Sequence, residues 1–185
     1  MRQAVLLVLM ISSFILGGCK NEAQKSEEEF KRFRNEFLAS ENITLEAEVE
    51  SLAANKYSKF KLSYEKDKDS ERIKVIEPDL IADISAEVKG DKGTLCYDGV
   101  VLETGTSDSE KTSPVNALPL MMKFLNEGYV KSVGIEKIGE KELVNSVLEL
   151  PDGLRMSTYF DNESNSLFGA AIIQNGNVIL RIKIL

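Results

Sequence analysis

The sequence predicts an α+β domain that is mainly antiparallel β. Apolar and polar residues alternate in many short segments from residue 43 onward, which is typical of half-buried strands. Two other segments, at about 27–40 and 113–128, have apolar residues at helical spacing. We expect about nine strands in a strongly curved sheet or an incomplete β-barrel, covered by the two helices, because a sheet with one apolar face must bury that face.

The first 18 residues have the pattern of a secretory signal. Arg2 precedes an apolar stretch from Ala4 to Leu16 that only two serines interrupt. A charged start, an apolar stretch of about 7–15 residues and small residues before the cleavage point make up a signal peptide. The stretch is shorter than the roughly 20 residues that span a bilayer as a helix. We therefore expect cleavage after Gly18.

The end of this stretch, Leu16-Gly17-Gly18-Cys19, resembles the bacterial lipobox, in which a peptidase cuts before a cysteine that carries diacylglycerol. Leu16, Gly17 and Gly18 are then the peptidase recognition residues, and Cys19 is the lipidation site. More than one acyl chain, at roughly 0.8 kcal/mol per buried methylene, makes a stable anchor. This predicts a lipid anchor on the extracytoplasmic side of the cell membrane. The alternative is an ordinary secretion signal followed by an incidental cysteine.

Length and charge restrict the class of protein further. Cleavage leaves 167 of the 185 residues, which suits a single domain with a substantial core. Arg2 is the only charge lost, so 22 basic and 30 acidic residues remain and the net charge is −8. This acidity argues against nucleic acid as a partner and against electrostatic adhesion to anionic lipid.

Cys96 has no partner for an internal disulfide if Cys19 is lipidated, because the chain has only two cysteines. We interpret it as a small strand residue. An intermolecular disulfide or a reactive thiol is the alternative.

The predicted domain begins with a helix. Residues 19–26 carry the lipidated cysteine and a short polar tether. Ser26, followed three residues later by Glu29, matches a capping box. We place the helix from about Glu27 to Ser40, with an aromatic and aliphatic stripe that faces the core. The stripe consists of Phe30, Phe33, Phe37 and Leu38.

Beyond Glu41 the apolar period changes from 3.6 to 2. The outward positions are largely charged, which predicts an antiparallel sheet with one wet face. Asp98-Gly99 is a strong hairpin turn signal, since both residues tolerate positive φ. The expected strands are 43–50, 60–64, 73–75 and 80–88, followed by a hairpin of 95–97 and 100–102.

A second helix opens at Ser113-Pro114, with serine as the cap and proline at the first helical position, and ends at Gly128. Its apolar side consists of candidate cavity or core residues: Met121, Met122, Phe124 and Leu125. Flexible methionines could line a lipid cavity. A plain core is the alternative, because such stripes commonly face the sheet that they cover.

The remaining sequence predicts further strands, with Pro151-Asp152-Gly153 and Asn175-Gly176 as turns. We expect the last strand to close the sheet. Pairing or swapping of edge strands between copies stays open. These strands are 130–138, 143–150, 154–160, 167–174 and 178–185.

The residue inventory argues against an enzyme, a cofactor and a metal centre. The chain has no histidine, the commonest general base and transition-metal ligand. It also has no GxSxG, serine-x-x-lysine or phosphate-loop motif. Asp161 to Asn165 has oxygen ligands spaced as in the start of a calcium loop, but Ile172 stands where the closing glutamate belongs. We interpret it as a turn.

Several short motifs together look like the LolA/LolB/LppX superfamily of lipoprotein carriers. They are the lipobox, the first helix, residues 72–78, 95–99 and 102–105, the Ser113-Pro114 helix and a late hairpin at 159–161. The resemblance implies a LolA-like incomplete barrel packed on helices, with an apolar concavity used for acyl chains.

Within that superfamily, the size, the lipid anchor and the Lys- and Glu-rich composition are most similar to the clostridial spore-germination lipoproteins. This resemblance implies a membrane-anchored, non-enzymatic protein that binds and supports the spore-cortex N-acetylmuramoyl-L-alanine amidase, so that muramic-δ-lactam forms. The alternative is a lipid or lipoprotein carrier with an apolar cavity.

Overall fold

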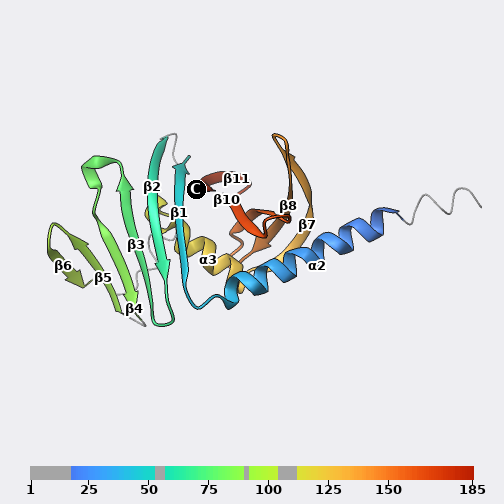
Figure 1. The fold of residues 1–185 in the computed structure, drawn as a ribbon. Helices are drawn as coiled ribbons and strands as arrows, with labels where there is room; N and C mark the ends of the chain where they lie inside the picture. Colours follow the sequence, from blue (N-terminus) through green and yellow to red (C-terminus); the bar gives the residue numbers. More distant parts are fainter. Residues whose placement is uncertain (1–17, 53–56, 90–91, 104–111) are drawn as a thin grey trace, which may run out of the picture.

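A computed structural model describes residues 18–52, 57–89, 92–103 and 112–185. Eleven strands form one sheet, and two α-helices and two short 3₁₀ helices accompany it (Figure 1). The helical elements are α2 (Gly18–Ala39), η2 (Asp79–Ile81), η4 (Pro114–Asn116) and α3 (Ala117–Glu127). The strands are β1 (Ile43–Ser51), β2 (Ser58–Lys66), β3 (Ser70–Glu77), β4 (Ser85–Lys89), β5 (Lys92–Tyr97), β6 (Val100–Glu103), β7 (Tyr129–Ile138), β8 (Lys141–Glu149), β9 (Arg155–Asp161), β10 (Ser166–Gln174) and β11 (Asn177–Ile184).

The strand order is β6-β5-β4-β3-β2-β1-β11-β10-β9-β8-β7. All neighbours pair antiparallel, which confirms the predicted fold class. The expectation that the last strand closes the sheet is wrong. β11 pairs with β1 on one side and β10 on the other, so it joins the two halves of the sheet.

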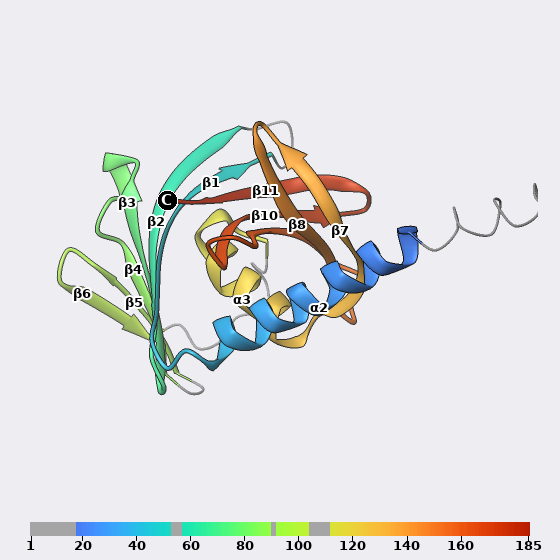
Figure 2. The same cartoon turned by 45° about the vertical axis from the view of Figure 1, so that its right-hand side comes forward.

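The sheet is open, with β6 and β7 as its two edges. The predicted total of about nine strands was too low, although eleven segments of the sequence were each expected to be a strand. The sheet is open and not strongly curled, so the expected strongly curved sheet or incomplete barrel is wrong. Helices α2 and α3 lie against one face (Figure 2), which we call the inner face. The open ends leave β6 and β7 each with one side free of a strand partner among the described residues.

Charged residues on the outer face form cross-strand pairs, as the period of two predicts. Lys59 Nζ lies 3.0 Å from Glu48 Oε1, and Lys61 Nζ lies 3.3 Å from Glu46 Oε2. The hydrogen bond from Lys59 lowers the pKa of Glu48. Such exposed pairs contribute little stability each. The outer face is therefore polar. The apolar inner face fixes the register of the strands, because a slip by one residue would move its apolar side chains to the outer face.

Helix α2 begins earlier than predicted. It starts at Gly18 and includes the residues expected to form a polar tether. Ser26 therefore lies inside the helix and is buried, and it is not an N-cap. A helix longer than its apolar stripe is allowed here, since residues 20–29 are mostly good helix formers.

The predicted strand 80–88 is also wrong in its first half. Pro78 has no backbone N–H, and the chain turns into η2 directly after it. Asp83 then adopts a left-handed conformation, with a φ of 67°. The strand β4 begins only at Ser85. The apolar alternation of Leu80 to Ile84 is therefore not a strand pattern.

The second helical segment consists of η4 followed by α3. Pro114 is at the start, as predicted, but the Ser113 side chain makes no capping hydrogen bond. The helix ends at Gly128, as predicted. Pro119 lies inside the first turn of α3, where its missing N–H leaves no intrahelical bond unmade.

The hairpin turns follow the prediction. Asp98 and Gly99 have φ values of 48° and 77°, and Asn175 and Gly176 have 51° and 79°. Positive φ at both turn positions is the geometry of a type I′ turn, which suits the twist of the flanking strands.

Candidate binding surface

The predicted anchor lies at the start of α2. Leu16 and Gly17 are outside the described residues, while Gly18 and Cys19 are in the first turn. No helix within the described ranges is long and apolar enough to cross a membrane. Lipidation of Cys19 therefore remains a prediction from the sequence.

The four candidate cavity or core residues of α3 are all buried. Met121, Phe124 and Leu125 are 0% exposed and Met122 is 3% exposed. They belong to one apolar cluster with the inner-face side chains of the sheet. Their burial supports the core interpretation over a lipid-lined cavity, because side chains of this protein surround them.

Aromatic residues of α2 pack on β9. The rings of Phe33 and Phe160 are stacked, with centroids 4.5 Å apart and planes 5° apart. The ring centroids of Phe30 and Phe160 are 6.0 Å apart, and those of Phe37 and Phe33 are 5.5 Å apart. Phe30, Phe33 and Phe160 are at most 1% exposed. The predicted aromatic stripe is therefore confirmed as core.

Polar contacts join α2 to the end of α3 and to the β9–β10 turn. Arg34 donates to the backbone carbonyl oxygens of Leu125 and Asn126 at the end of α3, where carbonyls lack helical partners. Burial lowers the pKa of Arg34. Arg32 donates to Asn162 at 3.2 Å, so α2 also contacts the β9–β10 turn.

Hydrogen bonds to Asp161 close the β9–β10 turn. The Asp161 carboxylate accepts hydrogen bonds from Lys141 Nζ at 3.1 Å and from the backbone N–H of Glu163 at 3.0 Å. Those contacts lower the pKa of Asp161, with Lys141 as the main cause. Asn165 donates to Glu36 of α2 at 2.6 Å. In the part of the chain that the structure describes, no group of three or more Cys, Asp or Glu is arranged to hold a metal ion.

Two buried polar features interrupt the inner face. The hydroxyls of Ser146 and Thr158 lie 2.7 Å apart and satisfy each other. The Tyr64 hydroxyl is buried and has no hydrogen-bond partner among the residues that the structure describes. Burial is the main cause that raises the pKa of Tyr64, and the Glu71 carboxylate adds to it electrostatically.

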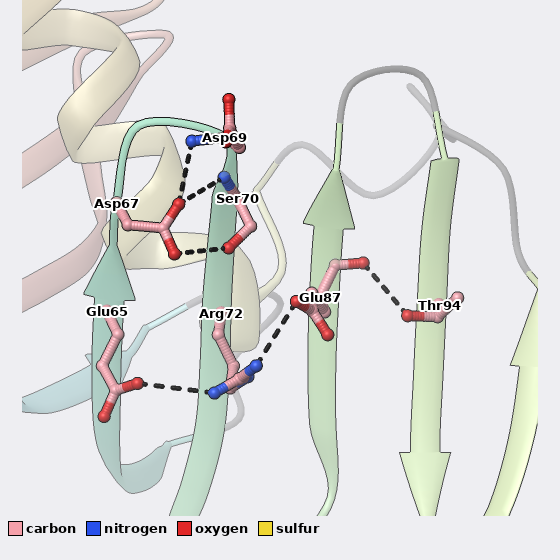
Figure 3. Close-up of polar contacts among 7 residues, drawn as sticks. All are labelled: Glu65, Asp67, Asp69, Ser70, Arg72, Glu87 and Thr94. Carbon is pink, nitrogen blue, oxygen red and sulfur yellow. Dashed lines mark hydrogen bonds and ion pairs between the residues drawn. The ribbon is translucent and has the colours of Figure 1, made fainter.

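A polar hollow of about 210 Å³ lies at the β2–β3 turn. The Asp67 carboxylate there accepts hydrogen bonds from the backbone N–H groups of Asp69 and Ser70, both at 2.8 Å, and from the Ser70 hydroxyl at 2.9 Å (Figure 3). These bonds close the turn and engage the carboxylate. The hollow is lined by Asn42, Thr44, Glu65, Lys66, Asp67, Ser70 and Arg72.

A row of side chains in register crosses the outer face from this hollow toward the β6 edge (Figure 3). The Arg72 guanidinium on β3 pairs with a carboxylate on each neighbouring strand. Its nitrogens lie 3.7 Å from Glu65 Oε2 on β2 and 3.3 Å from Glu87 Oε1 on β4. Thr94 follows on β5, and its hydroxyl donates to the Glu87 backbone carbonyl at 3.4 Å. Glu103 on β6 is opposite Thr94 and ends the row.

The inner face becomes exposed toward the same edge. Tyr64, Ile73 and Leu102 lie in one row of residues that are opposite one another across the strands from β2 to β6. Tyr64 is 0% exposed and Ile73 is 3% exposed, whereas Leu102 on the edge strand is 55% exposed. The main helix contacts are with β7, β8 and β11, and those of η4 are with β1 and β2. The edge hairpin therefore extends beyond the strands that the helices mainly contact. Its exposed apolar residues are Tyr97 (49%), Val100 (59%), Val101 (63%) and Leu102 (55%).

Sequence reasoning predicted this hairpin but missed its exposure. The available signal was the run Val100-Val101-Leu102, which places apolar residues on both faces of a short strand. Cys96 is in the neighbouring strand β5, as predicted, and is half-buried.

No family model matches the chain, and no curated protein matches it in sequence. Among solved structures, a LolA superfamily protein from Nitrosomonas europaea is similar, with a TM-score of 0.50, 11% identity, and coverage of 89% of this chain and 91% of that one. The lipoprotein LppX of Mycobacterium tuberculosis has a TM-score of 0.50 and 10% identity, covering 88% and 94%. The chain therefore has a LolA/LppX-like fold.

The structure of the CwlD amidase from Clostridioides difficile in complex with the GerS lipoprotein also contains a similar chain. The TM-score is 0.43 and the identity is 16%, with 85% of this chain and 91% of that chain covered.

Proposed function

We propose that this chain is a lipid-anchored, extracytoplasmic protein that acts by binding a protein partner and carries out no catalysis itself. The observation that supports this most is the burial of Met121, Met122, Phe124 and Leu125 in α3. A carrier with this fold would place an acyl chain on the face that these side chains occupy. The exposed apolar residues lie instead on a strand edge, which suits a protein contact.

The partner that we propose is the spore-cortex amidase CwlD, and the role is that of a GerS-like lipoprotein. The support is the sequence resemblance in size, predicted anchor and composition. In this role the chain would keep the amidase active at the membrane surface while muramic-δ-lactam is formed. The zinc chemistry would belong to the amidase, in keeping with the lack of histidine in this chain.

Gene deletion tests the role. We expect spores of the deletion strain to lack muramic-δ-lactam in their cortex, and a normal δ-lactam content would contradict the proposal. Complementation with Cys19→Ser separates binding from anchoring. The purified variant should bind CwlD as the anchored chain does, while in cells it should restore less δ-lactam because it is not held at the membrane.

The alternative function is a lipid or lipoprotein carrier, which the fold permits. It predicts a stoichiometric lipid bound without a covalent bond. For the carrier alternative to hold, α2 or α3 would have to leave the inner face, since Phe33 and Phe124 are at most 1% exposed in the present arrangement.

A further inference from the structure

The free edge of β6 has two features that a lone edge strand seldom combines. Val100 and Leu102 lie on the inner face and Val101 on the outer face, and all three are more than half exposed. Strands that are apolar on both faces are typical of positions inside a sheet. Natural edge strands are usually protected by charges, proline or a covering element.

The backbone of β6 is available at this edge. Tyr97 and Val100 flank the two-residue turn and pair with each other. Because hydrogen bonding alternates along an antiparallel ladder, the N–H and C=O groups of Val101 and Glu103 point away from β5. β6 has no other strand neighbour among the described residues. An added strand would therefore find donors and acceptors at both residues.

Charge specifies what the added strand must carry. Along the outer-face row, Glu65, Arg72 and Glu87 alternate in sign and pair across the strands. Glu103 ends the row, is exposed, and makes no ion pair with any described residue. A basic residue opposite Glu103 would continue the alternation, and apolar residues opposite Val100 and Leu102 would continue the inner face.

Pairing of β6 with β6 of a second copy does not meet these requirements. A two-fold pairing centred on Val101 places Val100 against Leu102 but Glu103 opposite Gly99, next to Asp98. A pairing centred on Leu102 places Val101 opposite Glu103. Neither arrangement gives Glu103 a cation, and the protein is acidic overall, with a net charge of −7.

We propose that the free edge of β6 binds an extended segment of a different protein, which adds an antiparallel strand and places a basic residue opposite Glu103. The segment has the pattern basic, apolar, any, apolar, read from the residue that faces Glu103 to the residue that faces Val100. This inference rests on the proposed partner-binding function and names the surface and the chemistry of its ligand.

A synthetic peptide containing Lys-Val-Thr-Val tests the proposal with the full chain in detergent micelles. Titration should shift the backbone amide signals of β6, and hydrogen exchange should slow at Val101 and Glu103. If the peptide does not bind, or if the shifts lie elsewhere on the molecule, the proposal is wrong. The same holds if the free chain dimerises through β6.

Two variants provide the specificity test. Val101→Pro removes an N–H that faces the free edge, where proline is tolerated, and should weaken peptide binding by about tenfold. Glu103→Lys should weaken binding of the lysine peptide by roughly two- to fivefold, and should favour a matched peptide with glutamate in place of lysine by a similar factor. Equal binding in all four charge combinations would overturn the role of Glu103, even if Val101→Pro fails to fold.

The amidase then separates this inference from the proposed function. If CwlD binds the wild-type chain and the Glu103→Lys variant equally, the partner-binding function stands and the β6 edge is not its site. If the peptide binds β6 as described but CwlD does not bind the chain, the edge stands and the proposed partner is wrong.

Discussion

Replacing Phe33 with alanine removes one of the buried side chains that pack α2 against the sheet. Phe33 is 1% exposed, and its ring is stacked on Phe160 at 4.5 Å. Truncation of a buried phenylalanine costs about 3–5 kcal/mol. We therefore expect the free energy of unfolding to fall by about 4 kcal/mol, a large share of the 5–15 kcal/mol typical of a domain.

The matched control is Phe37→Ala, which truncates the same residue type one turn along the same helix. Phe37 is only partly buried, so its loss should be about 1–2 kcal/mol. Equilibrium unfolding in urea, followed by circular dichroism, measures both variants. A double-mutant cycle with Phe160→Ala should give a coupling of about 0.5–1.5 kcal/mol from the stacked rings.

A loss below about 1 kcal/mol for Phe33→Ala, or a loss equal to that of Phe37→Ala, would refute this reasoning. It would mean that α2 does not pack on the sheet as described. The inner face would then be open to an apolar cargo, and the carrier alternative would gain support.

Three further predictions concern buried groups, charge and backbone spacing. Tyr64→Phe removes a buried hydroxyl that has no partner, so urea unfolding should show unchanged stability or a gain of up to about 1 kcal/mol; a loss of that size would reveal a missed partner. The pKa of Asp161 is lowered by Lys141, so its stabilising contribution is full above the ordinary carboxyl pKa and is lost as the pH falls through the lowered value. The stability difference between wild type and Asp161→Asn should therefore shrink between about pH 5 and pH 2, and a constant difference would contradict this cause. Gly169→Ala should destabilise the chain by about 1–3 kcal/mol because its Cβ would lie 2.4 Å from a β11 carbonyl oxygen, whereas Gly134→Ala, with nothing within 4 Å of the added Cβ, should show no such loss in the same unfolding assay.

Much of the fold followed from local patterns. The period of two located most strands, and the paired turn residues Asp98-Gly99 and Asn175-Gly176 located two hairpins, because these signals depend on residues close in sequence. The inner-face stripe of α2 was also predictable. Its true start at Gly18 was not, since the apparent capping box at Ser26 is a local pattern that a longer helix overrides.

Features that depend on distant parts of the chain were not predictable. The position of β11 between β1 and β10 is set by long-range pairing, and so is the open edge at β6. The methionine-rich side of α3 suited either a core or a cavity, and the sequence favoured the core because such stripes commonly face the sheet that they cover. Burial of Met121 and Phe124 in the folded chain favours the core. The exposure of Val100 and Leu102 on the inner face depends on how far the helices extend over that face, which no local signal encodes.

Native mass spectrometry of the full chain, purified from membranes in mild detergent, tests whether the protein's own side chains fill the inner face. If the protein's own side chains fill the inner face, the mass should be that of the mature chain with covalent acyl groups at Cys19 and no further lipid. A stoichiometric lipid that is held without a covalent bond, and is lost on unfolding, would contradict the account.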